Sequence, residues 1–330
     1  MSKKTFKNLL LVIIYVLMLI IVGKIFKVWS QITLLEAEGS FPSITHPHFT
    51  RYIVMLPIIY VSKLANIQEN TVFTGFVAIA ICVTAYFGSR FASLLVYKNL
   101  KNWPDLFGYY FAIFSILSFF MNGRFSIALL GVSIIIYGQV IHLVIRNSPV
   151  LLSFIYLCIG AFLASVSSGS FMIAIMVILM FLIYILVHKL PKISSRDIKL
   201  WFMFMLPGFG LSYYGMILFK KNLSFFDGSV FLMLEHGYGN IFYDSFLLVI
   251  INILILFSLI VFVGVIYYLF NGANKYQRGP FLVIIFLTIS TLLVGIFGWF
   301  ALAIGIIVVA TMMHVILLKI HSKKFFKIDT

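Results

Sequence analysis

An adjacent carboxylate and imidazole are the most reactive pair of side chains in this sequence. Glu235 and His236 are followed directly by Gly237, Tyr238 and Gly239. A carboxylate or an imidazole can transfer a proton near neutral pH. Glycine lets the backbone come close to a ligand. The stretch therefore predicts a site for acid–base chemistry, and a loop that only caps the next helix is the alternative.

A second polar segment holds two histidines separated by a proline. His46 and His48 lie downstream of Glu36 and Glu38 and are followed by Arg51. The histidine spacing is not a regular helical zinc pattern, and no clear third ligand accompanies it, so we expect no metal here. Carboxylates, imidazoles and a guanidinium are suited to a sugar or a phosphate. A solvated polar loop is the competing interpretation.

Two isolated arginines and a lysine pair complete the candidates. Arg124 follows Asn122 and Gly123 in a tight turn between apolar runs, where its planar fork could hold a phosphate or reach lipid head groups. Arg90 lies inside an apolar run, and we expect its side chain to extend to the nearer membrane face. Lys220 and Lys221 open the polar segment that contains Glu235.

The composition determines what kind of fold must position these residues. Of the 330 residues 63% are hydrophobic and 10% are charged, whereas a soluble domain is nearer one-quarter charged. In lipid the backbone must satisfy its own hydrogen bonds, and continuous apolar runs favour helices over a barrel. We predict an all-α, polytopic transmembrane bundle in a single domain, 1–330. Its ten spans are expected near 8–26, 71–97, 106–121, 125–145, 149–167, 171–187, 200–219, 245–270, 281–297 and 300–319.

The positive charges predict the orientation. Sixteen of the 24 Lys and Arg fall in alternate segments if the short run 52–64, which contains Pro57 and Lys63, does not cross. We therefore expect 52–64 to be an interfacial or re-entrant helix. Both termini are predicted to be cytoplasmic, in a multi-pass protein of the cytoplasmic membrane, with outer loops at 27–70 and 220–244.

Several classes of function are excluded by missing motifs. The sequence has no P-loop, no dinucleotide fingerprint, no zinc motif and no nucleophile elbow. Its net charge of +15 is spread over the inner segments, which indicates membrane orientation and not a nucleic-acid patch. We expect no cofactor, no metal and no nucleic acid, with membrane lipids as the surroundings.

The pattern of spans and loops resembles the bacterial polysaccharide polymerases of the Wzy-like and EpsG-like families. The run from Met121 to Ala128 is similar to the arginine-containing turn that opens an apolar helix in EpsG-like proteins, although Phe125 follows Arg124 where those proteins have Gln. The run from Glu235 to Gly239 resembles a His-Gly-x-Gly stretch of capsule polymerases.

This resemblance implies glycosyl transfer between undecaprenyl-pyrophosphate-linked repeat units on the outer face. Arg124, Arg51 and the lysine pair Lys220/Lys221 would hold the leaving pyrophosphate. Glu235 or His236 would be the base, with Glu36 or Glu38 as second choice, and Tyr238 would stack on a sugar. A chain-length regulator is an expected partner. A GT-C-like glycosyltransferase using a polyprenyl-phosphate sugar and a lipid-linked sugar flippase are the alternatives.

Overall fold

The structure is a computed structural model, and it is entirely helical over the residues that it describes. These are 3–28, 49–97, 99–120, 122–144, 149–167, 195–224 and 226–232, with short pieces between 171 and 183. The helices are α1 (Lys3–Val22), α3 (Phe49–Ala65), α4 (Glu69–Tyr97), α5 (Trp103–Phe120), α6 (Gly123–Val144), α7 (Val150–Ala164) and α9 (Ser195–Ser224). The predicted all-α class is therefore confirmed for this part of the chain.

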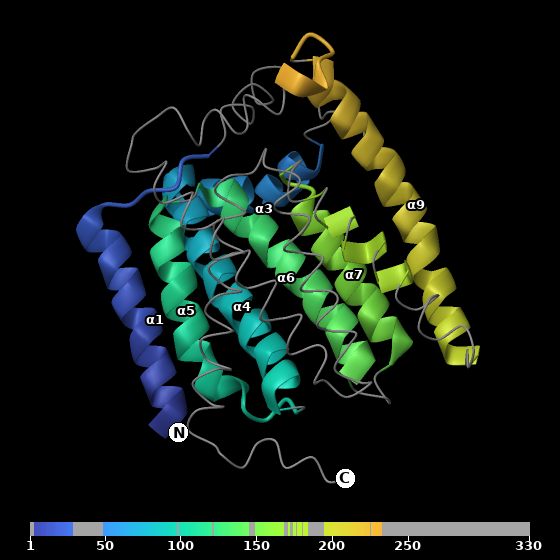
Figure 1. The fold of residues 1–330 in the computed structure, drawn as a ribbon. Helices are drawn as coiled ribbons and strands as arrows, with labels where there is room; N and C mark the ends of the chain where they lie inside the picture. The colour runs from blue at the N-terminus through green and yellow to red at the C-terminus, as the bar shows by residue number, and fades with distance from the viewer. Residues whose placement is uncertain are drawn as a thin grey trace, which may run out of the picture.

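Six of these helices form an antiparallel bundle. α1, α5, α7 and α9 run in one direction, whereas α4 and α6 run in the other (Figure 1). α4 packs between α5 and α6, and α6 packs against α7. The side chains at the centre of the bundle are large and fully buried, including Phe73, Phe111, Phe114 and Tyr110. The alternating directions follow from short connections between neighbouring apolar helices.

The helix ends are set by local hydrogen bonds. α1 ends at Gly23, which has a φ of +65°. There the amide of Gly23 donates to the carbonyl of Ile20 at 3.1 Å and that of Lys24 to Leu19 at 3.0 Å, a Schellman arrangement. α6 begins after Asn122, whose Oδ1 accepts a 3.0 Å hydrogen bond from the amide of Phe125. This N-cap separates α5 from α6 and places Arg124 in the first turn of α6.

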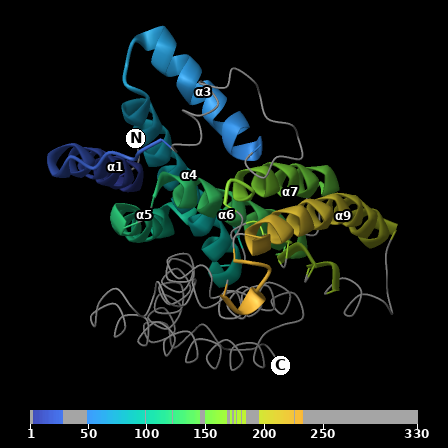
Figure 2. The same ribbon diagram turned by 90° about the horizontal axis from the view of Figure 1, so that it is seen from above.

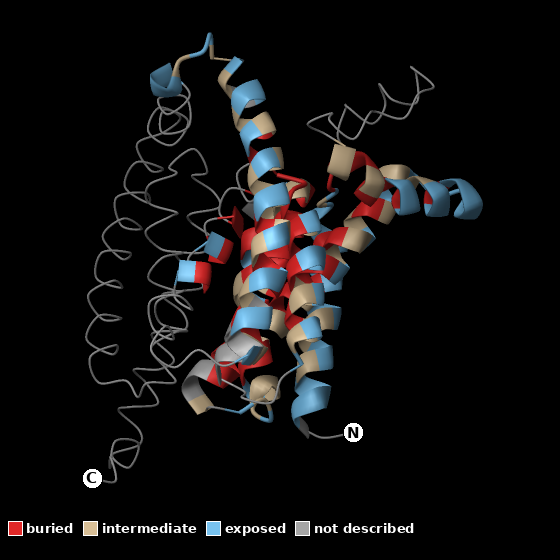
Figure 3. Ribbon diagram, turned by 90° about the vertical axis from the view of Figure 1, so that its right-hand side faces the viewer, coloured by how far each residue is buried: buried red, intermediate tan, exposed pale blue. Residues whose placement is uncertain are grey.

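Helix α3 differs from the others because it runs transverse to them and projects outward near one end of the bundle (Figures 2 and 3). Met55 and Ile58 of α3 are buried against the bundle, whereas Leu56, Tyr60 and Leu64 are exposed. Its 17 residues contain Pro57. A short helix with an apolar exposed side, running transverse to the helices of a bundle, has the form of an interfacial helix.

The outer surfaces of several helices are apolar. On α1, Tyr15 and Leu19 are buried, whereas Ile20 and Ile21 are 70% and 81% exposed. Within the residues that the structure describes, three stretches are long and apolar enough to cross a membrane: Lys4–Val22, Glu69–Leu94 and Trp201–Lys221. Gly123–Gln139 and Val150–Ala164 are shorter apolar stretches. By length and composition these helices indicate a membrane protein.

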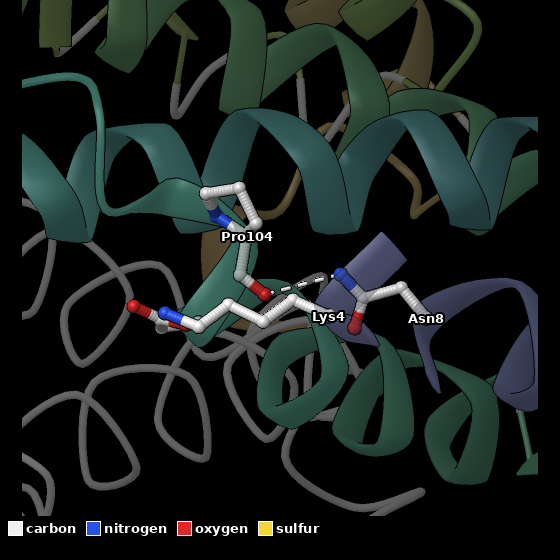
Figure 4. Close-up of polar contacts among 4 residues, drawn as sticks. Lys4, Asn8 and Pro104 are labelled. Carbon is white, nitrogen blue, oxygen red and sulfur yellow. Dashed lines mark hydrogen bonds and ion pairs between the residues drawn. The ribbon is translucent and has the colours of Figure 1, made fainter. Parts of the chain in front are cut away.

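Polar contacts fix α1 to α5 at both ends. Nζ of Lys4 lies 2.6 Å from Oδ1 of Asp105, and Nδ2 of Asn8 donates a 3.0 Å hydrogen bond to the carbonyl of Pro104 (Figure 4). At the other end, Nζ of Lys24 donates to the carbonyl of Phe119 at 3.0 Å. The N-terminus and the turn before α5 therefore share one end of the bundle.

The predicted boundaries shift where helices continue past their apolar cores. α1 begins at Lys3, before the expected start of its span at 8, and α9 extends to Ser224, five residues beyond the expected end at 219. The helical hydrogen bonds continue into the polar layer, which hydropathy does not detect. The expected spans 245–270, 281–297 and 300–319 lie outside the described residues.

Candidate functional site

Two arginines from helices far apart in the sequence lie near enough to influence each other electrostatically, at the end of the bundle from which α3 projects. Arg51 lies in the first turn of α3, and its side chain is only 7% exposed. Its Nε donates a 2.8 Å hydrogen bond to the carbonyl of Val166, just after α7. Next to it, Oγ1 of Thr50 donates to the carbonyl of Ser165 at 3.2 Å. These bonds satisfy carbonyls that the end of α7 leaves open.

The protein stabilises the positive charge of the Arg51 guanidinium poorly. Burial lowers the pKa of Arg51 to about 9, and the positive charge of nearby Arg124 is the second cause. Tyr214 and Tyr52 act in the opposite direction but less strongly. The guanidinium therefore remains charged at neutral pH, and a bound anion would offset both unfavourable effects.

Arg124 contributes the second guanidinium from the first turn of α6. Its Nε is buried, and no acceptor for it is found among the described residues. The guanidinium carbon lies 5.5 Å from the centre of the Phe125 ring, which offers a weak cation–π contact but no hydrogen bond. A buried N–H without an acceptor is costly, so this position is suited to an anionic ligand.

A tyrosine from α9 completes the cluster. Tyr214 is half-buried and lies close to Arg51 and Thr50. Neither Tyr214 nor Thr50 was predicted from the sequence as a site residue. Tyr214 stands in an apolar run beside Tyr213, which is 68% exposed, and only helical phase distinguishes the two. We call Thr50, Arg51, Arg124 and Tyr214 the arginine cluster.

Of the other predicted site residues, the structure describes only the lysine pair of α9, which lies away from the cluster. Lys220 and Lys221 are exposed in the last turns of α9, about 10 Å along the helix from Tyr214. The remaining candidates lie outside the described residues, and these are Glu36, Glu38, His46, His48, Glu235, His236 and Tyr238. Among the residues that the structure does describe, no three His, Cys, Asp or Glu side chains come together as a metal site.

The fold and the cluster define a helical membrane protein with two cationic forks at one end of its bundle. Two guanidinium groups that approach each other are suited to a ligand with more than one negative charge, such as a diphosphate. No family model matches the chain, and neither the curated proteins nor the solved structures contain a match.

Proposed function

We propose that this protein polymerises undecaprenyl-linked oligosaccharide repeat units on the outer face of the cytoplasmic membrane. The observation that carries this proposal is the pair of buried arginines at one end of the bundle, Arg51 and Arg124, which lie near enough for the charge of Arg124 to lower the pKa of Arg51. A pyrophosphate carries several negative charges, and as a leaving group it gains negative charge during glycosyl transfer. Preorganised cations at that position lower the barrier.

The reaction has one bond forming and one bond breaking. The hydroxyl oxygen of the incoming repeat unit attacks the anomeric carbon of the growing chain. The bond from that carbon to the pyrophosphate oxygen breaks, and undecaprenyl pyrophosphate leaves on the arginine cluster. A base accepts the hydroxyl proton, and Glu235 or His236 is proposed for that role.

The position of the cluster supports a lipid-linked substrate. Arg51 begins α3, whose exposed apolar side chains include Leu56, Tyr60 and Leu64. A helix of this kind, lying in the membrane interface, would hold a polyprenyl chain beside the bundle while its pyrophosphate reaches the arginines. Lys220 and Lys221 at the end of α9 would raise the local concentration of the anionic substrate.

Loss-of-function cells provide the test. Deleting the gene should leave repeat units made and flipped but not joined, so that single units accumulate on undecaprenyl pyrophosphate or on the final acceptor. Glu235→Gln and His236→Ala should reproduce this phenotype in a normally inserted protein, because removing a general base costs about 10²–10⁴ in rate. Lys27→Gln removes an exposed cation outside the cluster and should leave the polymer unchanged.

Other phenotypes would contradict polymerisation. If the deletion strain made polymer of unchanged length and amount, the proposed polymerase function would be wrong. Loss of every lipid-linked sugar would indicate a glycosyltransferase that acts earlier, and single units trapped on the inner leaflet would indicate a flippase.

A further inference from the structure

A third arginine forms a separate cluster inside the bundle, between α4 and α6. The guanidinium carbon of Arg90 lies 5.2 Å from the ring centre of Tyr86 and 5.2 Å from that of Tyr137. Nη1 of Arg90 also donates a hydrogen bond to the hydroxyl of Tyr86. Tyr137 is only 1% exposed. The cluster therefore consists of a cation between two tyrosines of neighbouring helices.

The guanidinium of Arg90 contacts tyrosines within the bundle. Arg90 lies seven residues before the end of α4 at Tyr97, or about 10 Å along the axis. Its partner Tyr86 lies one turn further from that end. Side chains on a helix point back toward its N-terminus, which here is the direction into the bundle. The sequence-based expectation of a snorkelling arginine therefore differs from the observed geometry.

No carboxylate neutralises this cation in the described part of the chain. Asp105, which lies at the same end of the bundle, is ion-paired with Lys4. Nε of Arg90 is buried and has no acceptor among the described residues. An isolated charge is costly within a membrane, so a counter-ion from outside the chain would stabilise this arginine.

We propose that Arg90, Tyr86 and Tyr137 bind the phosphate of an anionic lipid head group, in the half of the bundle that contains the N-terminus. A guanidinium and two phenol hydroxyls supply hydrogen-bond donors to phosphate oxygens. α4 has 29 residues, or about 43 Å, which matches a bilayer with its head-group layers. With α4 centred in the bilayer, Arg90 then lies about 4 Å inside the boundary of the hydrocarbon layer, where local thinning of the bilayer would let a lipid head group reach it.

This site is distinct from the arginine cluster and does not depend on the proposed polymerase activity. Arg90 and Arg124 belong to opposite ends of the bundle, because α4 and α6 run in the same direction, with Arg90 near the end of α4 and Arg124 at the start of α6. The ligand is a phosphodiester whose chemistry is shared by free phosphate, and the experiment must separate these two sources.

The test uses the full chain, purified in detergent, with native mass spectrometry and thermal melting. Phosphatidylglycerol should remain bound and raise the melting temperature, whereas phosphatidylcholine should do neither. Inorganic phosphate at millimolar concentration should have no effect on melting. Arg90→Gln should weaken phosphatidylglycerol binding about tenfold or more, the effect of losing charge-assisted hydrogen bonds. Lys7→Gln, an exposed cation at the same end, should bind as the wild type does.

A second variant keeps the proposal testable if Arg90→Gln does not fold. Tyr137→Phe preserves the ring beneath the guanidinium and removes only the hydroxyl donor. It should weaken lipid binding while the lipid-free melting temperature stays close to that of the wild type. Equal retention of the two lipids, or unchanged binding in Tyr137→Phe, would overturn the proposal. If inorganic phosphate alone raised the melting temperature, the ligand of this site would be free phosphate and not a lipid head group.

Discussion

Nε of Arg51 and the carbonyl oxygen of Val166 are joined by a 2.8 Å hydrogen bond that holds the start of α3 against the end of α7. The same guanidinium lies beside Arg124. Arg51 thus has a structural bond at one nitrogen and contributes charge to the arginine cluster. Replacing it would disturb both, which makes Arg124 the better position for testing the function of the cluster.

Arg124→Lys should therefore lose most of the polymer-forming activity while the amount of inserted protein stays normal. A lysine keeps the positive charge but cannot form the two parallel hydrogen bonds of a guanidinium to a phosphate. Complementation of a deletion strain, with polymer length read on a gel and protein amount read by immunoblot, would measure this. Full activity in Arg124→Lys would show that the side chain only reaches lipid head groups.

Pyrophosphate binding by the purified protein should depend on pH in a defined direction. The pKa of Arg51 is lowered to about 9, so the guanidinium is charged below pH 9 and loses its proton as the pH rises through that value. Stabilisation by pyrophosphate should therefore be full at pH 8 and should fall between pH 8 and pH 10. Thermal melting with and without pyrophosphate would check this. In Arg124→Gln, pyrophosphate should stabilise the protein less than it stabilises the wild type at every pH. Equal stabilisation of the variant and the wild type would show that Arg51 and Arg124 do not bind pyrophosphate together.

Hydropathy and charge patterns predicted the helices well, because these signals are local. The apolar runs around α4, α5, α6 and α7 each gave a helix close to its expected bounds, and Asn122 with Gly123 marked the break between α5 and α6. The arginine cluster could be predicted only in part. Arg51 and Arg124 were candidates by type, but nothing in the sequence indicates that α3 would bring them together.

Helical phase explains the residues that sequence reasoning missed. Tyr213 and Tyr214 are neighbours with the same chemistry, yet only Tyr214 lies toward Arg51, because consecutive residues differ by about 100° around a helix. For Arg90 the sequence showed the position along the helix but not the partners of the side chain. Its depth was clear from the sequence, but its contacts depend on how α4 packs against α6, which supplies Tyr137.

The two ends of the bundle should be reached by labelling reagents from opposite sides of the membrane. Ser224 is exposed at the end of α9, and Asn99 is exposed in the turn before α5, near the end that holds the N-terminus. In a background with Cys82 and Cys158 replaced by serine, Ser224→Cys should react with an impermeant maleimide in intact cells. Asn99→Cys should react only after the cells are opened, and its reaction in intact cells would contradict cytoplasmic termini.

The crossing of α6 and α7 should tolerate no side chain at Gly131. A Cβ added there would lie 2.5 Å from the carbonyl oxygen of Gly160, and one added at Gly160 would lie 2.7 Å from the carbonyl oxygen of Gly131. Both neighbours are backbone atoms, so the helices themselves would have to separate. Gly131→Ala should therefore destabilise the protein by about 1–3 kcal/mol, the usual cost of overpacking. This change should appear as a lower melting temperature in detergent.

The control for Gly131→Ala is the same substitution at Gly75, in α4, where nothing lies within 4 Å of the added Cβ. Gly75→Ala should leave the melting temperature unchanged or raise it, because alanine favours a helix over glycine by about 1 kcal/mol. Opposite effects of the two substitutions would support the close packing of α6 on α7. Equal melting temperatures for Gly131→Ala and the wild type would show that the two helices cross at a greater distance.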